Sequence, residues 1–182
     1  MKHCMRTFTA FCLALCAILI CASCNGRSKG SGLSVSDLET ALKKADSSLS
    51  LIGESTGDGR TYTANTVYST TNSGYSYTVK ADHDDCVTSV RIEAEADVEK
   101  MKYEDDFSKV LDKSSGQLTR SDLNILKCVL LAANLREAVG GSSVTKEDTL
   151  SLFANQTPWT IGNWTVKAEY TYSCVIITAV YS

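Results

Sequence analysis

The clearest pattern in the chain is a strict alternation of apolar and charged residues over positions 90–99. Apolar residues occupy the even positions, and the odd positions carry Arg91, Glu93, Glu95, Asp97 and Glu99. Successive side chains of a strand point to opposite faces, so this period of two predicts a strand with one dry face and one acidic, wet face. We expect the strand to begin at about Cys86.

Two further strands are predicted just before it. Residues 61–70 are rich in Thr, Tyr and Val, which favour strands. Residues 75–81 place every second side chain on one face, and these are Tyr75, Tyr77, Val79 and Ala81. Polar turns at residues 72–74 and 82–85 separate the three segments. We therefore expect an antiparallel meander.

Apolar residues at helical spacing predict four helices, over residues 36–51, 104–113, 121–139 and 145–154. Two starts compete for the first helix. One is a capping box of Ser36 with Glu39, and the other is an earlier cap at Ser34 with a Leu33–Leu38 hydrophobic staple. Thr145 is expected to cap the last helix.

The third of these helices is apolar over most of its circumference. Its only polar stripe is narrow and consists of Asn124, Lys127 and Asn134. A helix that is apolar nearly all round is typical of a buried element. We therefore expect this helix to be the central element beneath the sheet.

Residues 164–170 and 175–181 alternate again, with a turn near Tyr172 and Ser173, and predict a final hairpin. The expected order of elements is α-βββ-ααα-ββ. Strands in runs and helices in a block favour an α+β fold, with an antiparallel sheet of about five strands packed against the helices. Residues 33–182 are expected to form a single globular domain.

The first residues of the chain have the pattern of a secretory signal peptide. Lys2 and Arg6 precede an apolar run over residues 8–20, and the sequence Cys21-Ala22-Ser23-Cys24 follows. A basic region, a short apolar region and a small-residue cleavage site define such a peptide. The apolar run is shorter than the roughly 20 residues that a membrane span needs. We assign residues 1–23 to the signal.

Cys24 follows two small residues and resembles the lipobox cysteine of bacterial lipoproteins. Cys21 stands where the family pattern has a leucine-like residue. The resemblance implies cleavage before Cys24, a diacylglycerol on its thiol and acylation of the new amine, which together would anchor the protein to a membrane. Residues 24–32 then read as a flexible tether. The alternative is an ordinary signal cut after Ser23 or Gly26, which would release a secreted protein.

The net charge of the mature chain bears on the kind of partner that it could bind. Without Lys2 and Arg6, 16 basic residues face 21 acidic ones, a formal charge of −5. No dense basic cluster is present, which argues against nucleic acid as a partner.

Five of the eight cysteines lie at or before Cys24. Cys86 and Cys174 both fall in predicted strands and are the candidate disulfide pair, whereas Cys128 reads as a buried apolar residue.

The strongest candidate for a catalytic or metal-binding site is the turn Asp82-His83-Asp84-Asp85. Its carboxylates and imidazole are ligand types for a divalent cation, but the spacing of a calcium loop is missing and adjacent turn residues seldom converge. His83 with Cys86 would need a lowered thiol pKa, which acidic surroundings oppose. Nucleophile-elbow and phosphate-loop motifs are absent from the sequence. We therefore assign no catalytic residue, metal or cofactor.

Aromatic residues gather in and beside the predicted strands. Tyr and Trp are common both in strands and at binding surfaces, so core packing and a ligand face are both open. If a contact surface exists, we expect it to include Tyr68, Tyr75, Trp159 and Trp164. The sequence thus predicts an envelope-anchored, non-catalytic domain that binds an unidentified protein or small molecule. The alternatives are an exported hydrolase that uses residues 82–85 and a structural envelope protein without ligand.

Overall fold

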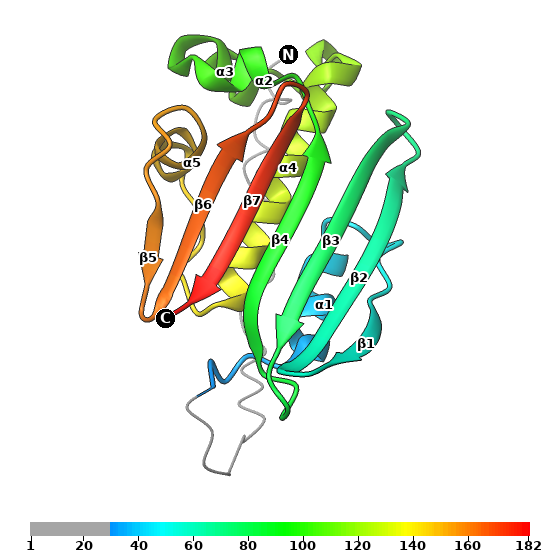
Figure 1. Ribbon diagram of the computed structural model, residues 1–182. Helices are drawn as coiled ribbons and strands as arrows, with labels where there is room; N and C mark the ends of the chain where they lie inside the picture. The colour runs from blue at the N-terminus through cyan, green and yellow to red at the C-terminus, as the bar shows by residue number, and fades with distance from the viewer. Residues whose placement is uncertain (1–29) are drawn as a thin grey trace, which may run out of the picture.

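Residues 30–182, which the computed structural model describes, form one antiparallel sheet of seven strands with helices against a single face (Figure 1). The predicted α+β class is confirmed, but the sheet has seven strands rather than five. The predicted signal peptide, Cys24 and most of the tether lie outside the described residues. Within the tether's described end, the Ser31 hydroxyl donates to the carbonyl of Val87 at 2.5 Å.

The sheet joins two parts of the chain that are far apart in sequence. The N-terminal meander consists of β1 (Ile52–Thr56), β2 (Gly59–Tyr68), β3 (Ser73–Ala81) and β4 (Val87–Glu95). The C-terminal part consists of β5 (Trp159–Ile161), β6 (Trp164–Tyr170) and β7 (Cys174–Tyr181). Strand β7 pairs with β4, which gives the order β1-β2-β3-β4-β7-β6-β5.

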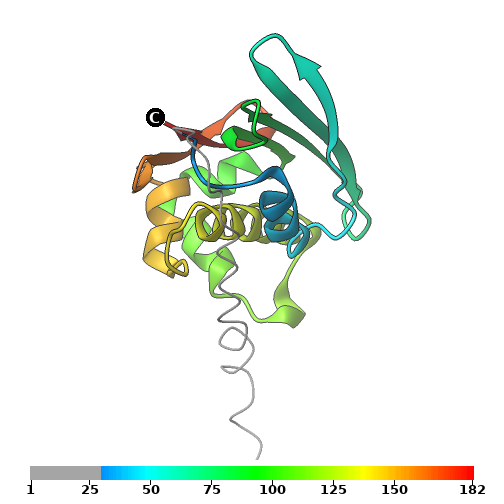
Figure 2. The ribbon, with the colours of Figure 1, turned by 90° about the horizontal axis from the view of Figure 1, so that it is seen from below.

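The helices are α1 (Val35–Lys43), α2 (Val98–Lys102), α3 (Glu104–Leu111), α4 (Arg120–Ala138) and α5 (Lys146–Phe153), with a short 3-10 turn η1 (Ser115–Gln117). Seen along the sheet, they all lie on one side of it (Figure 2). The earlier start of α1 is confirmed, because the Ser34 hydroxyl accepts from the amide of Asp37. Thr145 caps α5 as expected.

Two boundaries differ from the sequence prediction. Helix α1 ends at Lys43 rather than near residue 51, and the chain then turns so that Asp46 enters the core. The alternating segment also leaves the sheet early. Strand β4 ends at Glu95, and Asp97 caps the five-residue helix α2. Val98 is buried in helix α2, and a strand continued to residue 99 would also place it on the dry face. The apolar and charged alternation of residues 96–99 therefore does not distinguish a strand from a helix.

Helix α4 runs beneath the sheet, as predicted, and buries Ile125, Cys128, Leu131, Ala132 and Leu135 against it. These side chains join the inward residues of every strand from β2 to β7 in one core. The helix is not enclosed on all sides, because Leu130 on its outer surface is 54% exposed. All helices therefore serve one face of the sheet, and the other face is open to solvent.

Candidate functional site

The aromatic residues predicted as a contact surface lie in the core. Tyr75, Trp164 and Trp159 are only 2%, 4% and 8% exposed, and Tyr68 is partly buried against the same cluster. All four lie on the face of the sheet that the helices cover. The contact-surface prediction is therefore wrong for these residues, and the alternative of core packing is confirmed.

Tyr68 and Tyr75 instead enclose a buried ammonium group. Their rings meet edge to face at 6.5 Å, and Lys127 Nζ lies 4.3 Å and 4.7 Å from the two ring centroids. Lys127 projects from α4 towards the sheet and is 5% exposed. A cation so close to aromatic faces is stabilised by their quadrupoles, more strongly when water is excluded.

The charge of Lys127 is balanced by Asp46, whose Oδ1 lies 3.4 Å from Nζ. The Asp46 carboxylate also accepts hydrogen bonds from Thr66 Oγ1 (2.5 Å), Tyr77 Oη (2.6 Å) and Ser48 Oγ (2.7 Å). Burial opposes ionisation, but these hydrogen bonds and the nearby ammonium outweigh it and hold the pKa of Asp46 below its usual value. The pair ties the loop after α1 to β2, β3 and α4, so we assign it a structural role.

The acidic turn at residues 82–85 does not assemble a catalytic or metal site. Asp82 Oδ1 accepts the amides of Asp84 and Cys86, both at 2.9 Å. Asp85 turns to Arg60 Nη1 (2.5 Å) and Tyr62 Oη (2.6 Å), and its backbone φ is +59°. His83 is exposed. Asp82 thus stabilises the turn, and Asp85 ties it to β2. Within residues 30–182, no cluster of His, Cys, Asp or Glu is placed to hold a metal ion.

The proposed disulfide is incompatible with the register of the sheet. Cys86 precedes the first residue of β4, whereas Cys174 pairs with Glu95 at the other end of that strand. Nine residues of strand span about 30 Å, far beyond the ~7 Å limit between the Cα atoms of a disulfide. Cys128 is buried, as predicted, and desolvation raises the pKa of its thiol to about 12.

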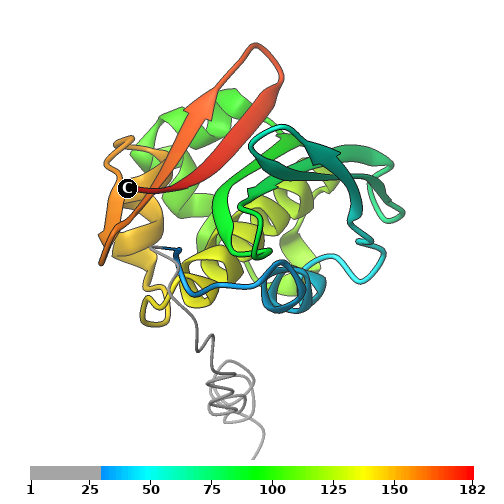
Figure 3. The same cartoon turned by 60° about the horizontal axis from the view of Figure 1, so that its bottom comes forward.

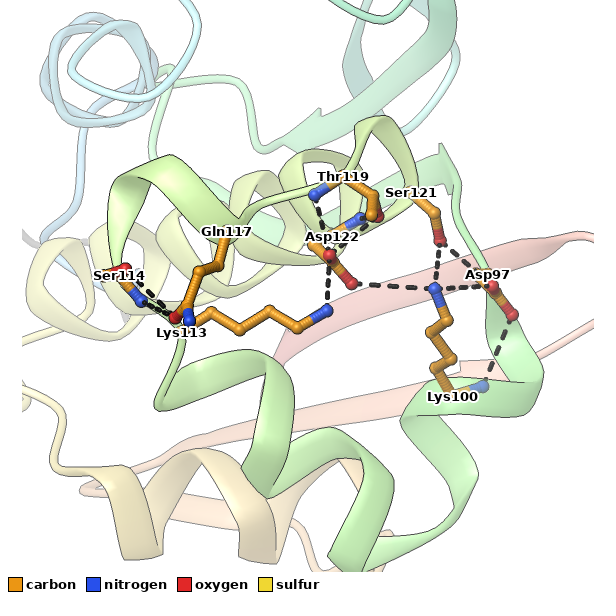
Figure 4. Close-up of polar contacts among 8 residues, drawn as sticks. All are labelled: Asp97, Lys100, Lys113, Ser114, Gln117, Thr119, Ser121 and Asp122. Carbon is orange, nitrogen blue, oxygen red and sulfur yellow. Dashed lines mark hydrogen bonds and ion pairs between the residues drawn. The ribbon is translucent and has the colours of Figure 1, made fainter.

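A second polar cluster centres on Asp122 in the first turn of α4 (Figure 4). Its carboxylate accepts the amide (2.8 Å) and hydroxyl (2.6 Å) of Thr119 and the ammonium of Lys113 (2.8 Å). Lys100 Nζ lies 3.6 Å away and links Asp122 to Asp97 of the α2 cap. Burial opposes ionisation, but the Lys113 and Thr119 contacts prevail and lower the pKa of Asp122. The cluster joins α4 to α2 and to the segment that follows α3.

The outer face of the sheet has no helix over it (Figure 2), and we call it the uncovered face. Its two central rows are defined by strand register. One consists of Thr78, Arg91, Thr178 and Lys167, and the other of Ser76, Glu93, Ile176 and Glu169. Their neighbours along each strand, such as Tyr77, Ile92 and Ile177, point into the core. The rows are therefore the outward positions of β3, β4, β7 and β6, although Ile176 among them is only 6% exposed.

Two of the surface recesses adjoin the uncovered face and the start of the described chain. One, of about 340 Å³, opens on the uncovered face beside Gly74, where Glu95 Oε2 accepts the Gly74 amide at 2.9 Å. The other, of about 620 Å³, lies where the described chain begins, between the Ser31–Leu33 segment, α1 and the end of α4. Figure 3 shows the start of the described chain passing the end of α4 before it enters α1. Asp37, Lys44 and Glu137 line its rim. Neither contains a group of residues that resembles a catalytic arrangement.

No family model, curated protein or solved structure matches this chain. Among the described residues, no helix is long and apolar enough to span a membrane. The sequence analysis missed the Asp46–Lys127 pair, although Lys127 is a charged residue within the apolar middle of α4. The polar positions of each alternating strand predicted that the sheet has a polar face. They did not predict the order of the strands across that face.

Proposed function

We propose that this protein is an exported, lipid-anchored envelope protein that works as a non-catalytic binding domain, with the uncovered face as its contact surface. The observation that carries this proposal is that all helices cover one face of the sheet and leave the other accessible (Figure 2). Besides its hydroxyl groups and charges, this face exposes Ile52, Val67 and Val180, which are 69%, 60% and 50% exposed. Apolar side chains among polar ones are typical of a non-obligate interface.

The anchor part of the proposal rests on the lipobox-like Cys24. Five residues separate Cys24 from Gly30, where the described structure begins, so six Cα–Cα steps join the two. That length of chain reaches at most about 21 Å. A lipid on Cys24 would thus keep the domain close to the membrane surface, with the end that carries Ser31 and the 82–85 turn facing it.

The mass of the protein purified from its native membranes tests the anchor. We expect a chain that starts at Cys24 and carries acyl groups, and we expect the variant Cys24→Ser to be recovered without them. An unmodified N-terminus at residues 24–27 in the wild-type protein would contradict the anchor and favour a secreted protein.

The contact surface is tested separately, by binding of residues 25–182 to isolated envelope fractions. This segment contains every residue of the described core. A lysine in the centre of the uncovered face, Thr178→Lys, should reduce binding at least tenfold. The matched control Thr40→Lys, exposed on helix α1 and therefore on the opposite side of the sheet, should leave it unchanged. Equal binding by both variants would contradict the choice of this face.

A further inference from the structure

We infer that the partner of the uncovered face is a second copy of this chain, bound face to face in an antiparallel dimer. The inference rests on the proposed use of this face. The two-fold axis would lie between the two sheets, perpendicular to the strands, and cross β7 between Ile176 and Thr178. The carrying observation is the way charge is distributed across the face.

The charges of the face are separated into a basic half and an acidic half. Lys80, Arg91 and Lys167 lie on the side of the axis towards the start of β4. Glu93, Glu95 and Glu169 lie on the other side. Only Glu54, on edge strand β1, departs from this division. Such a pattern is complementary to itself when one copy is inverted, as an isologous interface requires.

The register specifies which charges would meet. Arg91 and Glu93 are two residues apart on β4, on opposite sides of the axis, and form an ion pair within one chain. In the dimer each would also face the other in the second copy. Lys167 and Glu169 are related in the same way on β6. A two-fold axis parallel to the strands would instead place Arg91 over Lys167 of the other copy. Like-charge repulsion therefore selects the antiparallel arrangement.

The middle of the face is suited to close approach. Along β7, Val180 is 50% exposed and Thr178 is half-buried, whereas Ile176 is only 6% exposed. The charged residues flank them on β4 and β6. An apolar centre with a charged rim is the usual anatomy of a specific interface. Ile176 of one copy would lie against Thr178 of the other, and Val180 against Cys174.

The size of the face is sufficient for a dimer. The seven strands hold three to ten residues each. At about 3.3 Å per residue and about 4.8 Å between strands they make a face of roughly 800 Å². This is close to the ~800 Å² that each partner contributes to a standard interface. The two sheets would stack about 10 Å apart, as in a β-sandwich.

The charge pattern is tested by sedimentation equilibrium of residues 25–182 at micromolar concentrations. We expect a dimer that weakens with salt. Arg91→Glu should raise the dissociation constant at least tenfold, because two contacts become repulsive. The double variant Arg91→Glu/Glu93→Arg exchanges the two charges and should recover the dimer. A monomeric wild type, or a dimer indifferent to Arg91→Glu, overturns the inference, as does a double variant that stays monomeric although folded by circular dichroism.

Cross-linking tests the antiparallel register. In the proposed dimer, a cysteine at position 180 faces native Cys174 of the other copy, so a bis-maleimide of about 10 Å span should cross-link Val180→Cys efficiently. The control Thr61→Cys lies in the same row of the face, three strands away on β2, and should not reach Cys174. Equal cross-linking of both variants would contradict the register. A monomer that still loses envelope binding with Thr178→Lys would overturn the dimer but leave the proposed binding function intact.

Discussion

Lys127 Nζ lies 3.4 Å from Asp46 Oδ1 in the interior of the protein, and both side chains are almost wholly buried. The carboxylate has three hydroxyl donors and the ammonium lies between two tyrosine rings. Removal of one partner from such a pair leaves a buried charge without compensation, whereas removal of both does not.

Lys127→Met should therefore lower the free energy of unfolding by about 3–5 kcal/mol, the usual cost of breaking a buried pair. The double variant Lys127→Met/Asp46→Leu should be more stable than this single variant. Urea denaturation measures both. The control Lys109→Met removes a surface pair with Asp106 and should change stability by less than about 1 kcal/mol. A loss as small as the control's would show that the pair contributes little.

Stability should fall as the solution becomes acidic. Asp46, Asp97, Asp122 and Asp148 all have a pKa below the usual 3.8 in the folded protein. Below about pH 4 the unfolded chain binds protons that the folded protein does not, so unfolding is favoured. The contribution of these groups is complete above that pH and is lost as pH falls through each folded pKa.

Asp122→Asn should make this dependence shallower, since one of the four carboxyl groups is removed. The free energy of unfolding from urea titrations between pH 2.5 and 6 measures the slope. Thr63→Asn, exposed on β2, is the control. It removes no ionisable group and should leave the slope unchanged. An unaltered slope in Asp122→Asn would contradict the assigned role of Asp122.

The placement of Trp159 in the core predicts a large effect of truncation. Its ring packs against the guanidinium of Arg136 at 4.8 Å, and its Nε1 donates to the carbonyl of Asp148 at 3.2 Å. Trp159→Ala should cost about 3–5 kcal/mol, as for other buried aromatic residues. Tyr172→Ala, at a fully exposed turn, should lie within about 0.5 kcal/mol of wild type. Thermal and chemical denaturation compare the two; similar stabilities would restore Trp159 as a surface residue.

Gly59, at the start of β2, makes a close approach to the turn after β3. Its φ is +142°, and a Cβ there would lie 2.2 Å from the carbonyl oxygen of Ala81. Gly59→Ala should therefore destabilise the protein by about 1–3 kcal/mol, the range for overpacking and backbone strain. Gly57, two residues earlier, has open space at its Cβ position, so Gly57→Ala should be close to neutral in the same denaturation assay. Equal effects would contradict the close contact.

Local pattern was sufficient for the elements with strong periodicity. The polar and apolar positions of β3, β4, β6 and β7 alternate, and the apolar residues of α4 cover most of its circumference, so both kinds of element were predicted near their observed bounds. Strand β1 was missed because all five of its residues are exposed and carry no alternation of burial. It forms at the edge of β2, where Gly53 fits against the ring of Tyr62. That fit depends on a neighbour rather than on local sequence.

The candidate site was less predictable than the fold. Tyr75 and Trp164 have side chains that suit either a core or a binding surface, and only the position of the helices decides which face of a strand is covered. Cys86 and Cys174 are both near strand ends, but their separation follows from the direction in which β7 pairs with β4. A prediction from side-chain chemistry alone therefore placed the contact surface on residues that lie in the core. It also paired two cysteines that lie at opposite ends of β4.

The sequence by itself determined the α+β class, the alternation of the central strands and the apolar character of α4, because these depend on residues close together in the chain. It also contains the signal from which the anchor at Cys24 is proposed. Only the tertiary structure decided that Lys127 meets Asp46 and that Arg91, Thr178 and Lys167 share one row. Those relationships bring together residues dozens of positions apart, and they depend on strand order and register, which the alternation of single segments does not specify.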